Sequence, residues 1–192
     1  NQMILKPSMR PVAGWLALLR SDMFERIVKL EPDALLTQGD PESLTDLQRE
    51  RALLGFVGRY GRGQWRGLEV PNLQVARLAQ LNLTGIVLAA WGQGVESPEV
   101  RELLLRLVSA GRLQGCADLV AGVAADPSCS DRERFEAVMA LAALGDARLG
   151  PMIDGIVTLS SVWTERLARW VGTMLYPGHV TEFGPAAPGR AS

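Results

Sequence analysis

The stretch from Ser130 to Asp146, SDRERFEAVMALAALGD, constrains the fold more than any other part of the chain. Ser130 and Glu133 have the spacing of a capping box, in which each side chain pairs with a backbone N–H that the first helical turn leaves free. Gly145 can adopt the left-handed conformation that ends a helix. Between them lie two apolar stripes, Phe135, Val138, Met139 and Ala142 in one and Ala137, Leu141 and Leu144 in the other. Two stripes predict a helix buried against more than one neighbour.

Apolar residues recur at helical spacing through most of the chain, and polar caps or turns separate the runs. Ser97 is expected to cap one helix, which Gly111 ends. Ser43 or Thr45 should start a longer helix that reaches about Tyr60. No segment combines polar–apolar alternation with β-branched residues, so we predict no sheet. The expected fold is all-α with about ten or eleven helices, over residues 12–20, 21–28, 33–37, 45–60, 72–80, 83–91, 97–111, 116–126, 130–145, 149–157 and 163–174.

The helices also repeat along the chain. Shifting the sequence by 33 residues places Ser97 on Ser130 and Arg101 on Arg134. A period in this range, with two helices in each unit, is typical of an α-solenoid, in which stacked helix pairs bury a continuous core. We therefore expect antiparallel helix pairs stacked into a short right-handed superhelix.

A glycine- and arginine-rich stretch, GRYGRGQWRG, occupies residues 58–67. We interpret it as a loop or linker because so many glycines disfavour a regular element. Arg59, Arg62, Trp65 and Arg66 combine guanidinium groups with a stacking aromatic ring, which makes them candidates for contact with nucleic acid. The alternative is a flexible linker with ordinary surface arginines. The chain's net charge of −1 favours the linker.

This stretch divides the chain. We expect an N-terminal helical segment over residues 1–57 and a loop or linker over 58–71. Regular helical repeats should follow over 72–183, and a disordered tail over 184–192.

Two further arginines are candidates for an interaction surface. Arg101 and Arg134 occupy equivalent positions and would line a concave face. The alternative, which we favour, is that they make hydrogen bonds or salt bridges between repeats. The tryptophans at positions 15, 91, 163 and 170 lie on apolar stripes, and we expect them to anchor the core.

Composition excludes several functions. Apolar residues make up 47% of the 192 residues, which excludes disorder for most of the chain. His179 is the only histidine, and with Cys116 and Cys129 alone it forms neither a catalytic triad nor a zinc site. We expect no cofactor, no metal and no disulfide framework. No apolar run has the length of a membrane span, and the N-terminus lacks a signal peptide, so we expect a cytoplasmic protein.

The segments SPEVRELLLRLVSAG (97–111) and SDRERFEAVMALAALGD (130–146) resemble HEAT-type repeat helices. Arg101, Arg134, Gly145 and Asp146 are the positions that fit this family. The resemblance implies an α-solenoid of HEAT-like antiparallel helix pairs.

Four other segments, RPVAGWLALL (10–19), EPDALLTQGD (31–40), DLQRERALL (46–54) and RLARWVGTMLYPGHVT (166–181), are similar to the helical region downstream of the NTPase module in large bacterial STAND (NACHT-like) ATPases. The resemblance implies a sensor and oligomer-contact region of a signalling ATPase that detects a cellular cue or an invader such as a phage. The chain does not begin with Met and contains no phosphate-binding P-loop. We therefore expect a fragment of a longer protein whose nucleotide chemistry lies elsewhere.

The leading functional hypothesis is a non-enzymatic region that binds a protein partner, with self-association through the full-length protein. The alternative is a free-standing HEAT-like scaffold that binds protein or nucleic acid. An enzyme is a third hypothesis, which a deep pocket with clustered carboxylates would favour. We expect instead that Glu99, Glu102, Glu133 and Glu136 lie on solvated helix faces.

Overall fold

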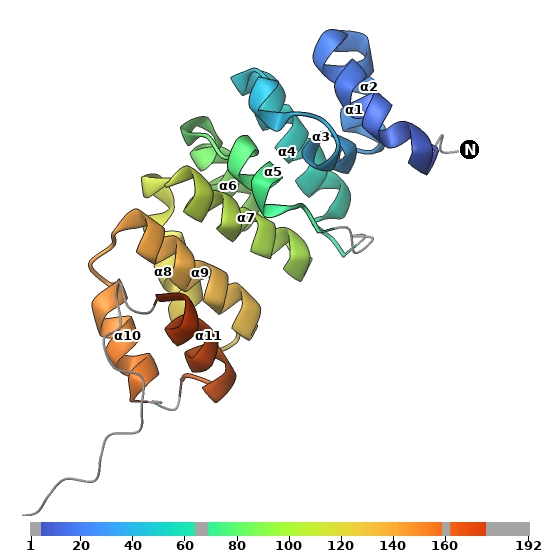
Figure 1. Ribbon diagram of the computed structural model, residues 1–192. Helices are drawn as coiled ribbons and strands as arrows, with labels where there is room; N and C mark the ends of the chain where they lie inside the picture. Colours follow the sequence, from blue (N-terminus) through green and yellow to red (C-terminus); the bar gives the residue numbers. More distant parts are fainter. Residues whose placement is uncertain (1–4, 64–68, 159–161, 176–192) are drawn as a thin grey trace, which may run out of the picture.

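The computed structural model describes residues 5–63, 69–158 and 162–175 (Figure 1). Within these residues the chain forms eleven α-helices, four short 3₁₀ helices and no strand, which confirms the prediction of an all-α fold. The α-helices are α1 (Arg10–Leu19), α2 (Ser21–Leu30), α3 (Asp33–Thr37), α4 (Asp46–Tyr60), α5 (Asn72–Leu78), α6 (Thr84–Gly92), α7 (Pro98–Gly111), α8 (Ala117–Ala125), α9 (Asp131–Leu144), α10 (Leu149–Val157) and α11 (Glu165–Leu175). The 3₁₀ helices are η1 (Pro7–Met9), η2 (Pro41–Ser43), η3 (Leu81–Leu83) and η4 (Gln114–Cys116).

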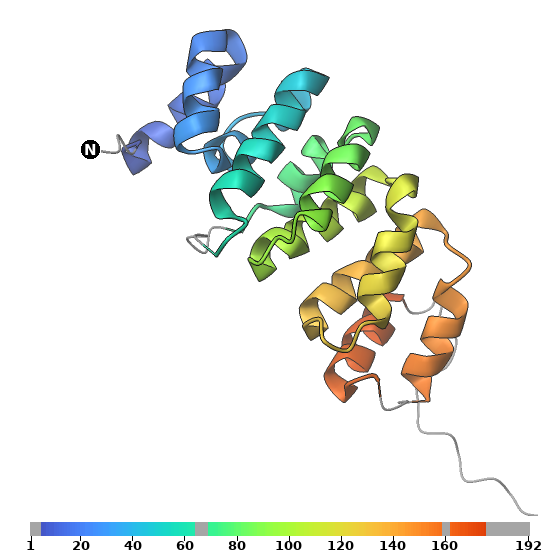
Figure 2. The same cartoon turned by 180° about the vertical axis from the view of Figure 1, so that it is seen from behind.

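The helices are stacked in an elongated array that follows the order of the chain (Figures 1 and 2). Helix α9 contacts α7, α8, α10 and α11. These neighbours cover both apolar stripes of α9, because Val138 of one stripe and Leu141 of the other are fully buried. The prediction that this helix is buried on more than one side is confirmed.

The expected caps fix where the helices begin. Glu133 N donates to Ser130 Oγ over 3.2 Å and Ser130 N donates to Glu133 Oε2 over 2.9 Å, so the predicted capping box is present at the start of α9. Gly145 ends the helix with a left-handed φ of 66°. Helix α4 begins with a second capping box, formed by Thr45 and Gln48. Ser43, the other candidate cap, lies in η2 instead.

Helix α4 ends at Tyr60, which confirms the predicted end of this helix, but the loop expected over 58–67 starts three residues later than predicted. Helix α4 continues through Arg59 to Tyr60, because Phe56 and Tyr60 anchor its last turn, with 5.1 Å between their ring centroids. Gly61 follows in a turn, and its carbonyl accepts hydrogen bonds from the backbone N–H groups of Glu96 and Ser97 over 2.8 and 2.9 Å. The stretch therefore begins against the N-terminus of α7.

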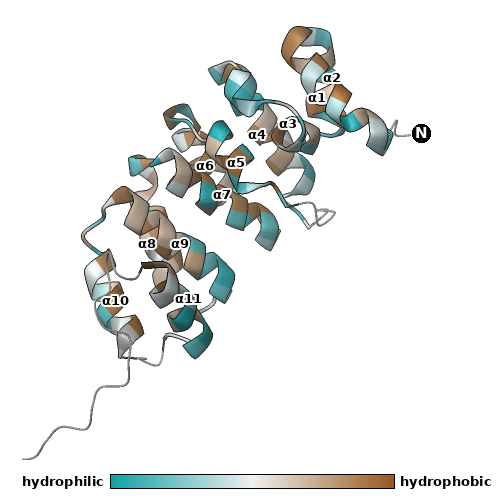
Figure 3. Cartoon of the chain, in the orientation of Figure 1, coloured by the Kyte–Doolittle hydropathy of each residue, from teal (hydrophilic) through white to brown (hydrophobic). Residues whose placement is uncertain are grey.

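The tryptophans differ from the expectation that all four anchor the core. Trp15 is 55% exposed and Trp170 is 37% exposed, whereas Trp91 and Trp163 are half-buried. Helix α1 buries small residues instead of its large ones, namely Ala13, Gly14 and Ala17. The hydropathy colouring in Figure 3 shows apolar turns on α1, at the N-terminal end of the stack.

No helix among the described residues is by itself long and apolar enough to cross a membrane. Helix α5 and the adjoining η3–α6 segment reach that length and hydropathy only as a pair, which is bent by 87°.

Candidate interaction site

The candidate residues of the glycine- and arginine-rich stretch do not form a described cluster. Arg59 is half-buried in the last turn of α4, and Arg62 is exposed in the turn that follows. Trp65 and Arg66 lie outside the described residues. Their proposed contact with nucleic acid stays a prediction.

Arg134 does not lie on an exposed surface, because its side chain is almost completely buried, with 2% of the residue exposed. Its Nε donates to the carbonyl of Ala124 over 3.1 Å, and its Nη1 donates to the carbonyl of Val162 over 2.7 Å. The guanidinium carbon lies 4.3 Å from the centroid of the Trp163 ring. Arg134 therefore joins the end of α8 to the segment before α11. Its buried side chain is not part of an exposed interaction surface.

Arg101, at the equivalent position of α7, is partly exposed and also engaged within the chain. Its Nε lies 2.7 Å from Glu133 Oε1, and its Nη2 donates to the sulfur of Cys129 over 3.3 Å. Its guanidinium covers the Trp91 ring at 4.7 Å. Arg101 and Arg134 thus lie on neighbouring helices, but each contacts a different tryptophan and a different interhelical segment.

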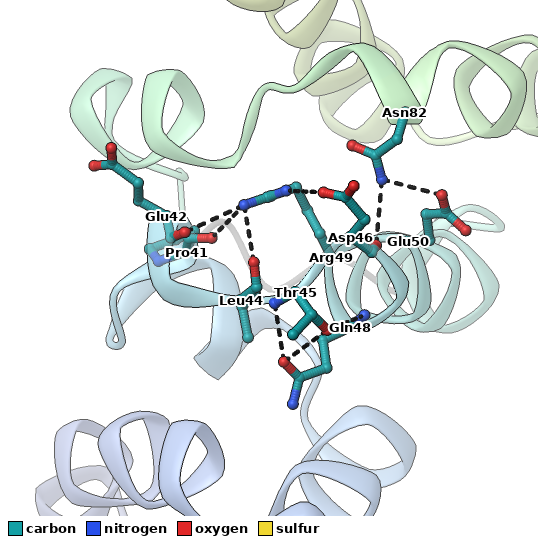
Figure 4. A network of polar contacts seen from close by, with 9 residues as sticks. All are labelled: Pro41, Glu42, Leu44, Thr45, Asp46, Gln48, Arg49, Glu50 and Asn82. Carbon is teal, nitrogen blue, oxygen red and sulfur yellow. Dashed lines mark hydrogen bonds and ion pairs between the residues drawn. The ribbon is translucent and has the colours of Figure 1, made fainter.

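Arg49 is a third arginine that follows a helix cap; it binds backbone carbonyls, and its role was not predicted from the sequence. It lies four residues after the cap Thr45, as Arg101 and Arg134 follow Ser97 and Ser130. Its Nη2 reaches the carbonyls of Pro41, Glu42 and Leu44, at distances of 3.5, 3.2 and 3.0 Å (Figure 4). The signal that could have found it is the repeated position relative to the cap.

A cleft of about 280 Å³ lies between α4, the segment that precedes α5, and the helices α7 and α9. Its deepest residues are apolar, because Phe56, Val70 and Leu103 are each at most 3% exposed. The other lining residues are charged: Glu69, Glu99, Glu102, Arg106 and Arg132. This cleft was not predicted from the sequence, because its residues come from four separate segments.

Among the described residues in and beside the cleft, carboxylates outnumber guanidinium groups. Arg132 lies 3.6 Å from Glu102 and 3.2 Å from Glu136, so one guanidinium serves two carboxylates. Burial raises the pKa of Glu102, Arg132 lowers it, and the nearby carboxylates, Glu136 first, raise it further. Burial is also the main cause of the raised pKa of Glu136. Both carboxylates are therefore incompletely compensated.

The guanidinium of Arg106 binds the segment that precedes α5 and the first residue of α5. Its Nη2 donates to the carbonyl of Val70 over 2.8 Å and to the side-chain oxygen of Asn72. Its Nη1 lies 3.8 Å from Glu69, whose side chain is 75% exposed. Arg106 thus holds the wall of the cleft together and leaves Glu69 and Glu99 open to solvent.

The expectation of solvated glutamates is wrong for two of the four. Glu133 is 4% exposed and Glu136 is 9% exposed, because α9 is covered on several sides. Glu102 is half-buried, and only Glu99 is exposed.

Other reactive groups lie elsewhere. Cys116 is fully buried, and burial raises the pKa of its thiol to about 11. His179 lies outside the described residues. Within the described ranges, no three His, Cys, Asp or Glu side chains are arranged to hold a metal ion.

Comparison with protein-family models, with curated proteins and with solved structures gave no match. The assignment of a function therefore depends on the residues described above.

Proposed function

We propose that this chain is a non-enzymatic protein-binding region of a larger STAND-type signalling ATPase, built as a HEAT-like α-solenoid. The caps of the last three long helices support a repeat. Ser97 and Ser130 are 33 residues apart, and Thr164, which accepts a hydrogen bond from Leu167 N over 3.1 Å, follows 34 residues later. The arginine four residues after the cap recurs in the first two of these helices.

The cleft between α4, α7, α9 and the segment that precedes α5 is the observation that carries the binding function. Its apolar floor and its excess of carboxylates suit a partner segment that presents an arginine or lysine beside an apolar side chain. Burial is the main cause of the raised pKa of Glu102 and of Glu136, and a cation bound beside them would favour the ionised carboxylates. The specific expectation is a basic, amphipathic protein segment.

The arginines provide a route by which binding would be transmitted. Arg101 ties α7 to the capping box of α9, and Arg134 ties α9 to the segment before α11. A change in the distance between α7 and α9 would therefore move the helices that follow as a rigid group.

Nucleic acid fits the cleft less well, because its phosphates would meet the same carboxylates. Catalysis is also less favoured. The raised pKa of Glu102 suits a general acid, but the described residues that line the cleft include no histidine, cysteine or serine to act beside it. We therefore favour binding over catalysis.

One experiment tests the larger protein directly. Sequencing the complete reading frame should reveal a GxxxxGK[ST] loop upstream of this chain. A complete reading frame without such a module would contradict the STAND assignment and favour the free-standing scaffold.

A second experiment tests the binding site. Lysates of phage-infected and uninfected host cells are passed over the immobilised chain and over the Glu99→Arg/Glu102→Arg double variant. We expect a basic protein that the parent chain retains, that the double variant loses, and that binds the parent again after purification. Glu165→Arg, a charge reversal at a 78% exposed site on α11, is the matched control. Equal retention by all three chains would contradict the assignment of the cleft.

A further inference from the structure

Arg132 places a positive charge against two carboxylates of the cleft. It lies in the first turn of α9, and its Nε is 3.2 Å from Glu136 Oε1 and 3.6 Å from Glu102 Oε2. One N–H group thus faces a carboxylate on its own helix and another on α7. Because Arg132 also lines the cleft, its guanidinium lies where the cation of a bound partner would meet these carboxylates.

Arg132 is held more loosely than Arg106, the other described arginine that lines the cleft. The side chain of Arg132 is 48% exposed, whereas that of Arg106 is 11% exposed. Arg106 donates to the carbonyl of Val70 over 2.8 Å, a distance typical of a hydrogen bond from a charged donor. The contacts of Arg132 are longer, and ion pairs that solvent reaches contribute little to stability. The guanidinium of Arg132 can therefore leave the two carboxylates at a small cost in free energy.

The two carboxylates, in contrast, are held inside the fold. The side chains of Glu102 and Glu136 are 25% and 11% exposed. Burial raises the pKa of both groups, and attraction to Arg132 is the largest effect that lowers it. If Arg132 moves away, either the carboxylates take up protons or another cation takes its place. The arrangement thus favours the exchange of one cation for another.

We propose that Arg132 is an internal placeholder for the partner's cationic side chain, which displaces it from Glu102 and Glu136 when the partner enters the cleft. The inference rests on the proposed function of the cleft. Because the entering cation replaces an existing ion pair, the cation alone gains little affinity. A partner must also cover the apolar floor formed by Phe56 and Leu103. Arg132 therefore makes the cleft select an apolar segment with a cation over a cation alone.

Methylguanidinium carries the charged group of arginine without an apolar neighbour, so it tests displacement separately from the binding of a protein segment. The side-chain carboxyl NMR signals of Glu102 and Glu136 are followed as it is added to the parent, to Arg132→Gln and to Arg169→Gln. Arg169 is the matched control, because its side chain is 74% exposed on α11 and its replacement changes the net charge equally.

The signals of the Arg132→Gln chain should reach half-saturation at an about fivefold lower methylguanidinium concentration than those of the parent, the factor expected for losing a partly exposed ion pair. Arg169→Gln should behave as the parent. Equal half-saturation concentrations for Arg132→Gln and either other chain would overturn the proposal, as would unchanged signals in Arg132→Gln.

A short peptide with one arginine between two leucines separates this inference from the proposed function. Arg132→Gln should bind the peptide about fivefold more tightly than the parent does. Equal or weaker binding by Arg132→Gln would leave the proposed function standing and overturn the placeholder. If no chain binds the peptide although methylguanidinium prefers Arg132→Gln, the proposed function fails and the role of Arg132 stands.

A measurement on the parent chain needs no variant to fold. The side-chain Nε–H NMR signal of Arg132 should shift when the peptide binds, because the group leaves its two carboxylates. An unchanged signal in the peptide-bound parent would overturn the proposal. Circular dichroism checks that Arg132→Gln and Arg169→Gln remain helical.

Discussion

Arg101 of α7 and Glu133 of α9 form an ion pair with 2.7 Å between Nε and Oε1. The other carboxylate oxygen of Glu133 accepts a hydrogen bond from Ser130 N over 2.9 Å. One buried side chain thus closes the cap of α9 and also receives the arginine of the preceding long helix. The start of α9 and its packing on α7 depend on the same group.

Substitutions of Glu133 should therefore have graded effects. Glu133→Gln keeps a capping side chain but loses the ion pair, and should lower the free energy of unfolding by about 1 to 2 kcal/mol. Glu133→Ala loses both and should cost about 3 kcal/mol, because Arg101 is left without its carboxylate. Urea denaturation of each variant measures its free energy of unfolding relative to the parent. Equal losses for the two variants would show that the ion pair contributes nothing beyond the cap.

Replacing Arg134 should destabilise the chain strongly. Arg134→Ala removes the donors to the carbonyls of Ala124 and Val162 and the contact with Trp163, so we expect a loss of about 3 kcal/mol. Arg169→Ala is the control, since this side chain is 74% exposed and pairs with an exposed glutamate, and it should cost less than about 0.5 kcal/mol. Similar midpoints for the two variants would contradict a structural role for Arg134.

Two helical glycines should respond oppositely to alanine. At Gly14 the new methyl group would meet the backbone of Gly39, so Gly14→Ala should cost about 1 to 3 kcal/mol. At Gly85, in α6, nothing lies within 4 Å of the new Cβ, and alanine should stabilise the helix by up to about 1 kcal/mol. Thermal unfolding of the two variants and the parent measures both changes in stability. A stabilised Gly14→Ala chain would contradict the close approach that holds α1 in place.

The raised pKa of Glu102 predicts a pH dependence. The folded chain keeps this carboxyl protonated to a higher pH than the unfolded chain does. Its contribution to stability is therefore present at low pH and is lost as the pH rises through the raised pKa. Glu102→Gln stays neutral, so its stability relative to the parent should increase between about pH 4 and pH 7. Urea midpoints measured across this range should diverge, and a constant difference would contradict the burial of the charge.

Local sequence signals predicted the helices and their ends well. The capping box at Ser130 and the left-handed Gly145 depend on neighbouring residues, and both are present, while Thr45 caps α4 as one of the two candidates. Gly111 shows the limit of such reasoning. Arg112, with a φ of 48°, is the left-handed residue there, and Gly111 is helical with no space for a Cβ beside Leu113 and Ala79.

Contacts between distant segments could not be predicted in this way. An apolar stripe signals burial, but Trp15 and its neighbours are exposed because the packing of α1 is decided by Gly14 and Gly39. The cleft could not be located because Glu69, Glu102 and Arg132 belong to three segments that only the tertiary fold brings together.

The most direct test of the account is a titration of the isotope-labelled chain with a short peptide that carries one arginine between two leucines. Backbone amide NMR signals of cleft residues, Glu69, Glu99, Glu102 and Leu103, should shift on addition of this peptide. They should not shift with a peptide that carries glutamate in place of arginine, nor in the Glu99→Arg/Glu102→Arg variant. The absence of shifts, or equal shifts with both peptides, would contradict the claim that the cleft binds a basic protein segment.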